Sequence, residues 1–184
     1  MIKKAIILAG GLGTRLSPIT KSVSKQLLPV YDKPLIFYPL SVLMLCNIKN
    51  ILIIVKKGEK RNFQAALGDT RDLGINLEFK EQIKPTGIPE AFIIGEKFIN
   101  RNSVALILGD NFFYGQGLTE ILKRNFTLKN GARIFTYPIN DPHNFGIVEK
   151  TNRKNKVRIV EKPKNSKSNL AITGFYLFDK NVSD

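Results

Sequence analysis

The stretch ILAGGLGTRLSPITKSVSKQLLPV, from Ile7 to Val30, begins as an apolar strand and breaks at the glycine-rich segment 10–13. It then carries Arg15 and Lys25 through a loop rich in hydroxyl side chains. Glycine lets the backbone approach a ligand closely, and exposed backbone N–H groups can hold phosphate oxygens. Arginine adds a permanently charged bidentate contact and lysine adds a point charge. The stretch predicts a strand followed by an anion-binding loop, with a bare turn and solvated cations as the alternative.

The composition is that of a globular chain. The chain has 184 residues, of which 43% are hydrophobic and 24% are charged, so we expect one domain. The apolar run in MIKKAIILAGG stops at glycines, which is too early for a signal peptide, and we expect a cytoplasmic protein without a membrane span. The single cysteine, Cys46, lies in an apolar segment and is expected in the core.

The formal net charge of +14 raises the question of nucleic-acid binding. The lysines are spread along the chain, and the chain is rich in Lys, Asn and Ile together, a bias that genome composition alone can produce. We therefore favour an anionic small molecule as the partner and keep nucleic acid as the weaker alternative.

Apolar runs alternate with helical patterns as far as Pro138. Such alternation predicts an α/β fold with an open, doubly wound, mostly parallel sheet covered on both faces. The expected strands are residues 2–9, 51–55, 77–79, 103–108 and 132–137. The expected helices are residues 34–46, 59–67 (ending at Gly68), 89–98 and 118–128.

The pattern changes after Pro138. Residues 146–150, 156–162 and 172–179 have the character of strands, with polar turns and no helical pattern between them. We expect these three strands to form an antiparallel extension of the sheet.

Neither of two common phosphate-binding motifs is present. The dinucleotide motif GxGxxG requires a third glycine where Leu16 stands, and the pattern GxxxxGK[ST] does not occur. The full string GGLGTRLSPIT…SKQLLPVYDKP instead resembles the signature of the sugar-1-phosphate nucleotidylyltransferases. The resemblance continues in EQIKPTGIPEAFIIGEKFI (81–99), LILGDNFFYG (106–115), NDPHNFGIVE (140–149) and KSNLAITGFYLFD (167–179), so it covers essentially the whole chain.

The resemblance implies a Rossmann-like nucleotide-diphospho-sugar transferase fold and a nucleotidyl transfer. It points most closely to members that use dTTP and glucose 1-phosphate, forming dTDP-glucose and pyrophosphate, and that assemble as homo-oligomers. Such a reaction requires positioning and charge neutralisation. The family's catalytic positions correspond to Arg15, Lys25 and Asp110. Its nucleotide-binding positions correspond to Gly10, Gly11, Gly13, Thr14, Arg15, Lys25, Gln82, Gly87 and Asp110, with Gln82 and Gly87 at the base.

Asp110 is the candidate metal ligand. It follows the apolar run 103–108, and a carboxylate at the carboxyl end of a strand can hold Mg²⁺ against triphosphate oxygens. The pattern alone also allows a turn or helix-capping aspartate. The resemblance favours the metal role and implies Mg²⁺ as the cofactor.

The sugar-phosphate pocket of the family corresponds to five further positions: Asn111, Gly146, Glu161, Lys162 and Ile172. Glu161 can accept hydrogen bonds from sugar hydroxyls, and Lys162 can neutralise the incoming phosphate. Without the resemblance, these two residues would be interpreted as an exposed pair at a strand end. We expect His143 in a solvated loop and the three aromatic residues 112–114 in the core.

The sequence departs from the family pattern in the segment after Gly87 and in its length. Ile88, Pro89 and Glu90 stand where the family usually has Leu-Ala-Gln. We also expect residues 1–184 to be a single nucleotidyltransferase domain lacking the C-terminal portion of the family, which carries a second metal-binding aspartate. The alternative function is therefore a catalytically impaired relative that still binds nucleotide or sugar phosphate.

Overall fold

The centre of the sheet consists of the apolar runs expected from the sequence. The computed structural model describes residues 1–151 and 156–183. Its parallel strands lie in the order β5 (Asn76–Gln82), β4 (Asn50–Lys56), β1 (Lys4–Ala9) and β6 (Val104–Leu108). Most residues of β1, β4 and β6 are buried, because helices cover both faces of these strands. The predicted α/β fold class is confirmed.

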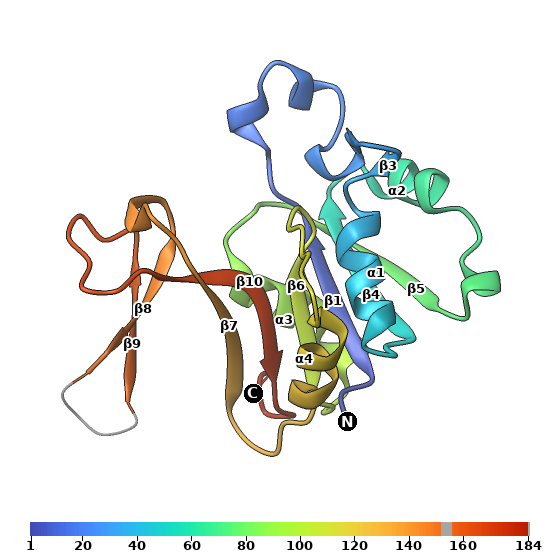
Figure 1. Cartoon of the computed structure of the whole chain (residues 1–184). Helices are drawn as coiled ribbons and strands as arrows, with labels where there is room; N and C mark the ends of the chain where they lie inside the picture. Colours follow the sequence, from blue (N-terminus) through green and yellow to red (C-terminus); the bar gives the residue numbers. More distant parts are fainter. Residues whose placement is uncertain (152–155, 184) are drawn as a thin grey trace.

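Four helices in the described parts of the chain cover the sheet (Figure 1). α1 (Phe37–Leu45), α2 (Lys60–Leu67) and α4 (Leu118–Asn125) contribute to the core on one face, whereas α3 (Ile88–Ile99) packs on the other. All four helices were predicted, with small errors at their ends. Pro34 lies in the short strand β3 (Lys33–Pro34), which pairs with β2 (Pro29–Val30), so α1 begins later than expected.

α3 lies close against the sheet. Its buried residues, Ala91, Phe92, Gly95, Phe98 and Ile99, recur at helical spacing. A Cβ on Gly95 would fall 2.9 Å from Ile6 Cδ1, so the glycine allows the helix to approach β1. The start of α3 lies beside the carboxyl end of β5, where Gln82 bonds to Glu90.

One strand differs from the prediction. β7 (Ala132–Pro138) was expected in the parallel set, but among the described strands it pairs only with β10 (Leu170–Phe178), and this pairing is antiparallel. β10 also pairs antiparallel with β6 and so lies between β6 and β7. Local apolar character identifies a strand but not its neighbour, which here comes from about forty residues further along the chain.

The predicted antiparallel extension is present. β8 (Gly146–Lys150) and β9 (Val157–Glu161) form a hairpin that projects away from the main sheet, joined to it where Ile147 pairs with Ala171 (Figure 1). Short 3₁₀ helices complete the described structure: η1 (Thr14–Leu16), η2 (Ile19–Lys21), η3 (Lys25–Leu27), η4 (Arg71–Leu73) and η5 (Pro142–Asn144).

Cys46 lies in the core at the end of α1, as predicted, and is 4% exposed. Burial raises the pKa of its thiol to about 12. In the part of the chain that the structure describes, every helix is too short or too polar to cross a bilayer.

Candidate active site

The glycine-rich loop rises from β1 at the carboxyl end of the sheet (Figure 1). Ligands of open α/β sheets bind at this end. Gly13 has φ +61°, and its carbonyl accepts a hydrogen bond from Thr20 Oγ1 at 2.9 Å, which folds the loop back on itself. The neighbouring Thr14 and Arg15 begin η1 and are exposed. The Arg15 side chain forms no hydrogen bond or ion pair with any described residue and is therefore available to an anion.

Lys25 and Asp110 meet at this end of the sheet. Lys25 Nζ lies 2.8 Å from Asp110 Oδ2, and each side chain is 32% exposed. Lys25 comes from η3, in the loop after β1, and Asp110 comes from the turn after β6, the strand next to β1. The ion pair therefore joins the segments that follow two neighbouring strands. The two residues that the sequence assigned to phosphate and metal contacts are direct neighbours.

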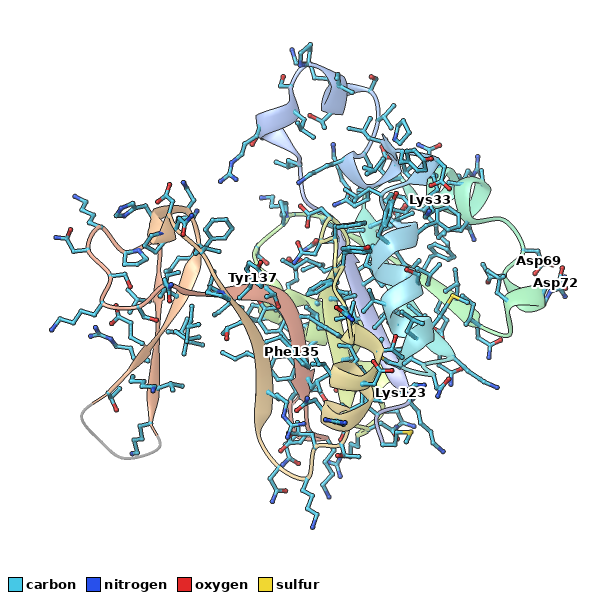
Figure 2. The ribbon with its side chains drawn as sticks, in the orientation of Figure 1. Lys33, Asp69, Asp72, Lys123, Phe135 and Tyr137 are labelled. Atoms are coloured by element: carbon cyan, nitrogen blue, oxygen red, sulfur yellow. The ribbon has the colours of Figure 1, made fainter. Side chains whose placement is uncertain are left out.

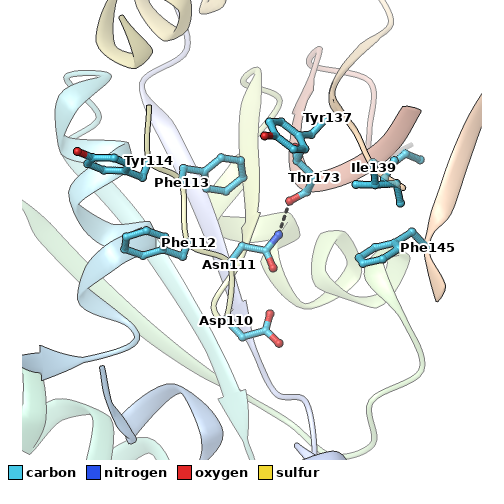
Figure 3. Close-up of a pocket in the computed structure, with 11 residues that line it drawn as sticks. Asp110, Asn111, Phe112, Phe113, Tyr114, Tyr137, Ile139, Phe145 and Thr173 are labelled. Atoms are coloured by element: carbon cyan, nitrogen blue, oxygen red, sulfur yellow. Dashed lines mark hydrogen bonds between the residues drawn. The ribbon is translucent and has the colours of Figure 1, made fainter. Parts of the chain in front are cut away.

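Asn111 is held by a β-bulge in β10. Its Nδ2 donates a hydrogen bond to the Thr173 carbonyl (Figure 3). The register between β7 and β10 shifts between Ile172 and Tyr176, and Gly174 inside this irregularity has φ +72°. A Cβ on Gly174 would fall 2.2 Å from Asn111 Nδ2. The absence of a side chain at Gly174 therefore leaves the space that the Asn111 amide occupies.

A cavity of about 440 Å³ opens beside Asp110 and Asn111. Figure 3 shows aromatic side chains of the segment 112–114 on one side of it and Tyr137, Ile139 and Phe145 on the other. Among the described residues, Asp110 is the only carboxylate that lines it. An apolar cavity with a few polar groups at one side is typical of a small-molecule site.

The prediction that residues 112–114 lie in the core is wrong for two of the three. Phe112 is 54% exposed and Tyr114 is 91% exposed, whereas Phe113 packs on the core against Phe175. The segment is a loop, so successive side chains point in different directions. The rings of Phe112 and Tyr38 contact each other edge to face, with 4.7 Å between their centroids.

Gln82 and Gly87 lie on the α3 side of the glycine loop. Gln82 ends β5, is 3% exposed and directs Oε1 toward Gly10, where an added Cβ would fall 2.2 Å from that oxygen. Gln82 Nε2 donates to Glu90 Oε2 at 2.5 Å. Gly87 precedes α3 with φ +116°. The two residues assigned to the nucleotide base are thus linked to the glycine loop and to the start of α3.

The hairpin brings three predicted sugar-phosphate residues together. Gly146 pairs with Glu161 across β8 and β9, and a Cβ on Gly146 would fall 3.1 Å from Glu161 Oε2 and 3.5 Å from Ile172 Cδ1. Lys162 Nζ lies 3.9 Å from Glu161 Oε1, and both side chains are exposed. Of the predicted site residues, only Asp110, Asn111 and Ile172 line the cavity itself.

One buried polar residue beside Lys25 was not predicted to belong to the site. Gln26 follows Lys25 and was not singled out from the sequence; it is 3% exposed, and its Oε1 has no hydrogen-bond partner among the described residues. A buried acceptor without a hydrogen-bond partner is costly, which suggests a ligand partner.

His143 is exposed, as predicted, and its Nδ1 lies 2.9 Å from the Pro163 carbonyl oxygen.

The cavity residues that were not predicted as site residues are Phe112, Phe113, Tyr114, Tyr137, Ile139, Phe145, Ala171 and Thr173. Thr173 sits in the β-bulge, and Tyr137 and Phe135 lie along β7 (Figure 2). Tyr137 and Thr173 line the same cavity as Asp110 only because β10 pairs between β6 and β7. Gly174 within an apolar strand was the one local signal of a bulge.

Comparison with known proteins agrees with this geometry. The sequence profile of the nucleotidyl transferase family matches residues 4–184. The chain belongs to the nucleotidyl transferase family. A glucose-1-phosphate thymidylyltransferase of Neisseria gonorrhoeae is 54% identical over 176 residues, which cover 96% of this chain and 61% of that protein. One of the same name from Xanthomonas campestris pv. campestris is 50% identical over 182 residues, covering 99% and 62%. This nucleotidyl transferase chain therefore spans about three-fifths of the length of the curated relatives it matches.

Solved structures support the fold of this nucleotidyl transferase. A Bacillus anthracis protein, provisionally named a glucose-1-phosphate thymidylyltransferase and crystallised with a sucrose, aligns with a TM-score of 0.84 and 37% identity, covering 96% of this chain and 71% of that one. A UDP-glucose pyrophosphorylase complexed with UDP-glucose aligns with a TM-score of 0.79 at 24% identity, covering 100% and 78%. The second likeness concerns the fold alone.

Proposed function

We propose that this chain takes part in transfer of a thymidylyl group from dTTP to glucose 1-phosphate, giving dTDP-glucose and pyrophosphate. A phosphate oxygen of glucose 1-phosphate bonds to the α-phosphorus while the bond from that phosphorus to the bridging oxygen breaks, and pyrophosphate leaves with the electron pair. The observation that carries the proposal is the contact of Lys25 with Asp110, whose carboxylate lines the cavity. It supplies a cation and a carboxylate where a triphosphate and a sugar phosphate would meet.

The cationic residues serve charge neutralisation, because both reactants are anionic. We assign Arg15 to the leaving pyrophosphate, since its exposed guanidinium has no partner among the described residues. We assign Lys25 to phosphate oxygens near the reacting centre. Gly10, Gly11, Gly13 and Thr14 supply the loop whose backbone N–H groups face the nucleotide, and Gln26 is an added candidate contact.

The residues fit Mg²⁺ bound together with substrate. No cluster of three or more His, Cys, Asp or Glu side chains suited to a metal occurs within residues 1–151 and 156–183. Mg²⁺ does not require such a cluster, since it commonly keeps several waters and uses one or two carboxylates plus substrate phosphates. Asp110 is the carboxylate that would hold it. When bound, the ion would neutralise phosphate oxygens.

The sugar phosphate is assigned to the cavity and the adjoining hairpin. Asn111 and Ile172 line the cavity, and the Gly146–Glu161 pair lies within contact distance of Ile172. Glu161 would accept hydrogen bonds from sugar hydroxyls, and Lys162 would meet the phosphate. The bulge that holds Asn111 orders this side of the site before a ligand binds.

Domain organisation and assembly are part of the proposal. The continuous sheet of eight strands that the described residues form supports residues 1–184 as a single nucleotidyltransferase domain. The resemblance to the family supports a cytoplasmic enzyme that assembles with copies of itself. A second candidate function is nucleotide or sugar-phosphate binding without turnover, which is favoured by Asp110 being the only described carboxylate in the cavity.

The test mixes purified chain with Mg²⁺, glucose 1-phosphate and dTTP, UTP or CTP in turn and measures pyrophosphate. We expect turnover to be fastest with dTTP, and equal or faster turnover with CTP would reject the base assignment. Binding of dTTP by calorimetry without pyrophosphate release would support the second candidate. A well-folded sample that binds no nucleoside triphosphate at saturating Mg²⁺ would rule out both.

A further inference from the structure

Glu90 binds three donors through a single carboxylate oxygen. Its Oε2 accepts from Gln82 Nε2 at 2.5 Å, from the Thr86 backbone N–H at 3.1 Å and from the Thr86 hydroxyl. These bonds, that of the Thr86 hydroxyl first, hold the pKa of the Glu90 carboxyl below its usual value. The group is ionised at neutral pH, and an ionised carboxylate can only accept hydrogen bonds.

The carboxylate fixes which way the Gln82 amide faces. An amide offers an NH₂ donor at one end and an oxygen acceptor at the other. Because Glu90 only accepts, the NH₂ end must face it, and Oε1 faces the opposite way, toward Gly10. Gln82 is 3% exposed, and its Oε1 accepts no hydrogen bond from a residue in the described parts of the chain. An oriented acceptor is therefore presented beside the glycine loop.

A backbone donor lies close to this acceptor in the chain. Thr86 binds the same Glu90 oxygen as Gln82, and Gly87 follows Thr86 directly. The Gly87 N–H precedes the first turn of α3 and donates to no other described residue. The site thus offers one acceptor, from Gln82, and one donor, from Gly87.

We propose that Glu90 is a positioning residue that sets the base preference of the site by holding the Gln82 amide with its oxygen toward the ligand. Thymine and uracil present an N3–H donor beside a carbonyl oxygen at position 4, which complements this pair. Cytosine presents the reverse, an acceptor at N3 and an amino donor at position 4. The inference rests on the proposed function, in which Gln82 and Gly87 contact the base.

Glu90 lies at a position where this chain departs from the family pattern. Glu90 stands in the run Ile88-Pro89-Glu90, where the family usually has Leu-Ala-Gln. A glutamine there can donate as well as accept, so it would allow either orientation of the Gln82 amide. A carboxylate allows only one.

The experiment measures dissociation constants of dTTP, dCTP and dUTP by calorimetry with Mg²⁺, for the unaltered chain and for Glu90→Gln. dTTP and dCTP share their sugar and triphosphate, so their ratio reports the base. We expect Glu90→Gln to lower the preference for dTTP over dCTP by about tenfold, the worth of roughly one hydrogen bond. The ratio of dTTP to dUTP should not change, because both bases share the same donor and acceptor edge.

Glu96→Gln is the matched control. Glu96 is exposed on the same helix, and its side chain bonds to no described residue. The control should keep the original dTTP to dCTP ratio although it removes the same charge. A purely structural role of Glu90 would weaken all three nucleotides equally and leave the ratios unchanged.

The outcomes separate this inference from the proposed function. An unchanged dTTP to dCTP ratio in Glu90→Gln overturns the positioning role while the proposed function stands. The positioning role is also overturned if the unaltered chain itself binds dCTP as tightly as dTTP. A folded chain that binds none of the three nucleotides overturns both. If Glu90→Gln does not fold, Glu90→Ala removes the same anchor and must lower the same ratio.

Discussion

Lys25 Nζ lies 2.8 Å from Asp110 Oδ2, so the loop after β1 and the turn after β6 meet through an ion pair. Each side chain is 32% exposed, and solvent screens a pair of this kind, which contributes at most about 1 kcal/mol to stability. The pair therefore matters for where it places two charges rather than for holding the fold together. A ligand carrying phosphate and a divalent ion could separate the pair at little cost.

Replacing Asp110 with asparagine keeps the size of the side chain and removes its charge. We expect Asp110→Asn to lower the rate of pyrophosphate release by at least about a hundredfold, because the carboxylate proposed as the metal ligand is lost. The far-ultraviolet circular dichroism and the melting temperature should stay close to those of the unaltered chain.

Asp72→Asn is the control for this charge change. Asp72 is exposed in η4, at the edge of the molecule beyond β5 and away from β7 (Figure 2). The rate of pyrophosphate release by Asp72→Asn should equal that of the unaltered chain. Unchanged turnover in Asp110→Asn would remove Asp110 from the metal role.

Lys25→Met tests the other member of the pair. We expect the dissociation constant for dTTP to rise about tenfold, since a charged hydrogen bond to phosphate contributes roughly 1.5–3 kcal/mol. The free energy of unfolding should change by less than about 1 kcal/mol. Lys21→Met, an exposed lysine in η2, should leave dTTP affinity nearly unchanged. Equal losses in both variants would show that general positive charge, rather than Lys25, attracts the nucleotide.

The sequence predicted that the glycine-rich loop and Asp110 lie at the same edge of the sheet, but not the Lys25–Asp110 contact itself. Apolar runs identify β1 and β6 as buried parallel strands, and the carboxyl ends of parallel strands share one edge. Residues that follow such strands directly are therefore expected near one another. The general location of the site followed from this rule without any knowledge of side-chain contacts.

The lining of the cavity could not be predicted in the same way. Tyr137 and Thr173 become neighbours of Asn111 only because β10 lies between β6 and β7. A strand pattern carries little information about its partner, since pairing depends on packing across the whole sheet. The bond between Glu90 and Gln82 was missed for a different reason, because it joins a strand end to a helix start across an irregular loop.

Asp179 should make stability depend on acid pH. Its carboxylate accepts backbone hydrogen bonds from Asn181 at 2.9 Å and Gly131 at 2.5 Å, and these bonds lower its pKa. A carboxyl whose pKa is lower in the folded state stabilises the fold above its unfolded pKa, near 4, and loses that contribution as pH falls through the folded pKa. We expect Asp179→Asn to be less stable than the unaltered chain at pH 7.

Denaturant titrations at several pH values check this prediction. The difference in unfolding free energy between Asp179→Asn and the unaltered chain should shrink steadily as pH falls below about 4. Asp72→Asn should track the unaltered chain at every pH. A difference that stays constant down to the lowest pH would mean that Asp179 acts through packing alone.

Cys46 should be unreactive in the folded chain. The thiol is 4% exposed, and its pKa is raised to about 12, so little thiolate exists at pH 8. We expect Ellman's reagent to label Cys46 at pH 8 only after denaturant is added. Rapid labelling of the folded chain would show that the end of α1 opens to solvent.

Gly174→Ala tests the bulge that holds Asn111. Gly174 has φ +72°, and an added Cβ would fall 2.2 Å from Asn111 Nδ2 and 2.8 Å from Leu108 Cδ1. The left-handed backbone alone costs an alanine about 1–2 kcal/mol, and the new methyl group must displace Asn111 from Thr173. We expect a loss of stability of roughly 2 kcal/mol and weaker binding of glucose 1-phosphate, measured by denaturation and by calorimetry.

Gly115→Ala is the matched control, because a Cβ at Gly115 would meet no atom within 4 Å. Its stability and its affinity for glucose 1-phosphate should both stay near those of the unaltered chain. If Gly174→Ala loses stability but keeps its affinity, the bulge supports the fold without shaping the sugar-phosphate side of the site. If affinity falls as well, the direction in which Asn111 points is part of how that side recognises its ligand.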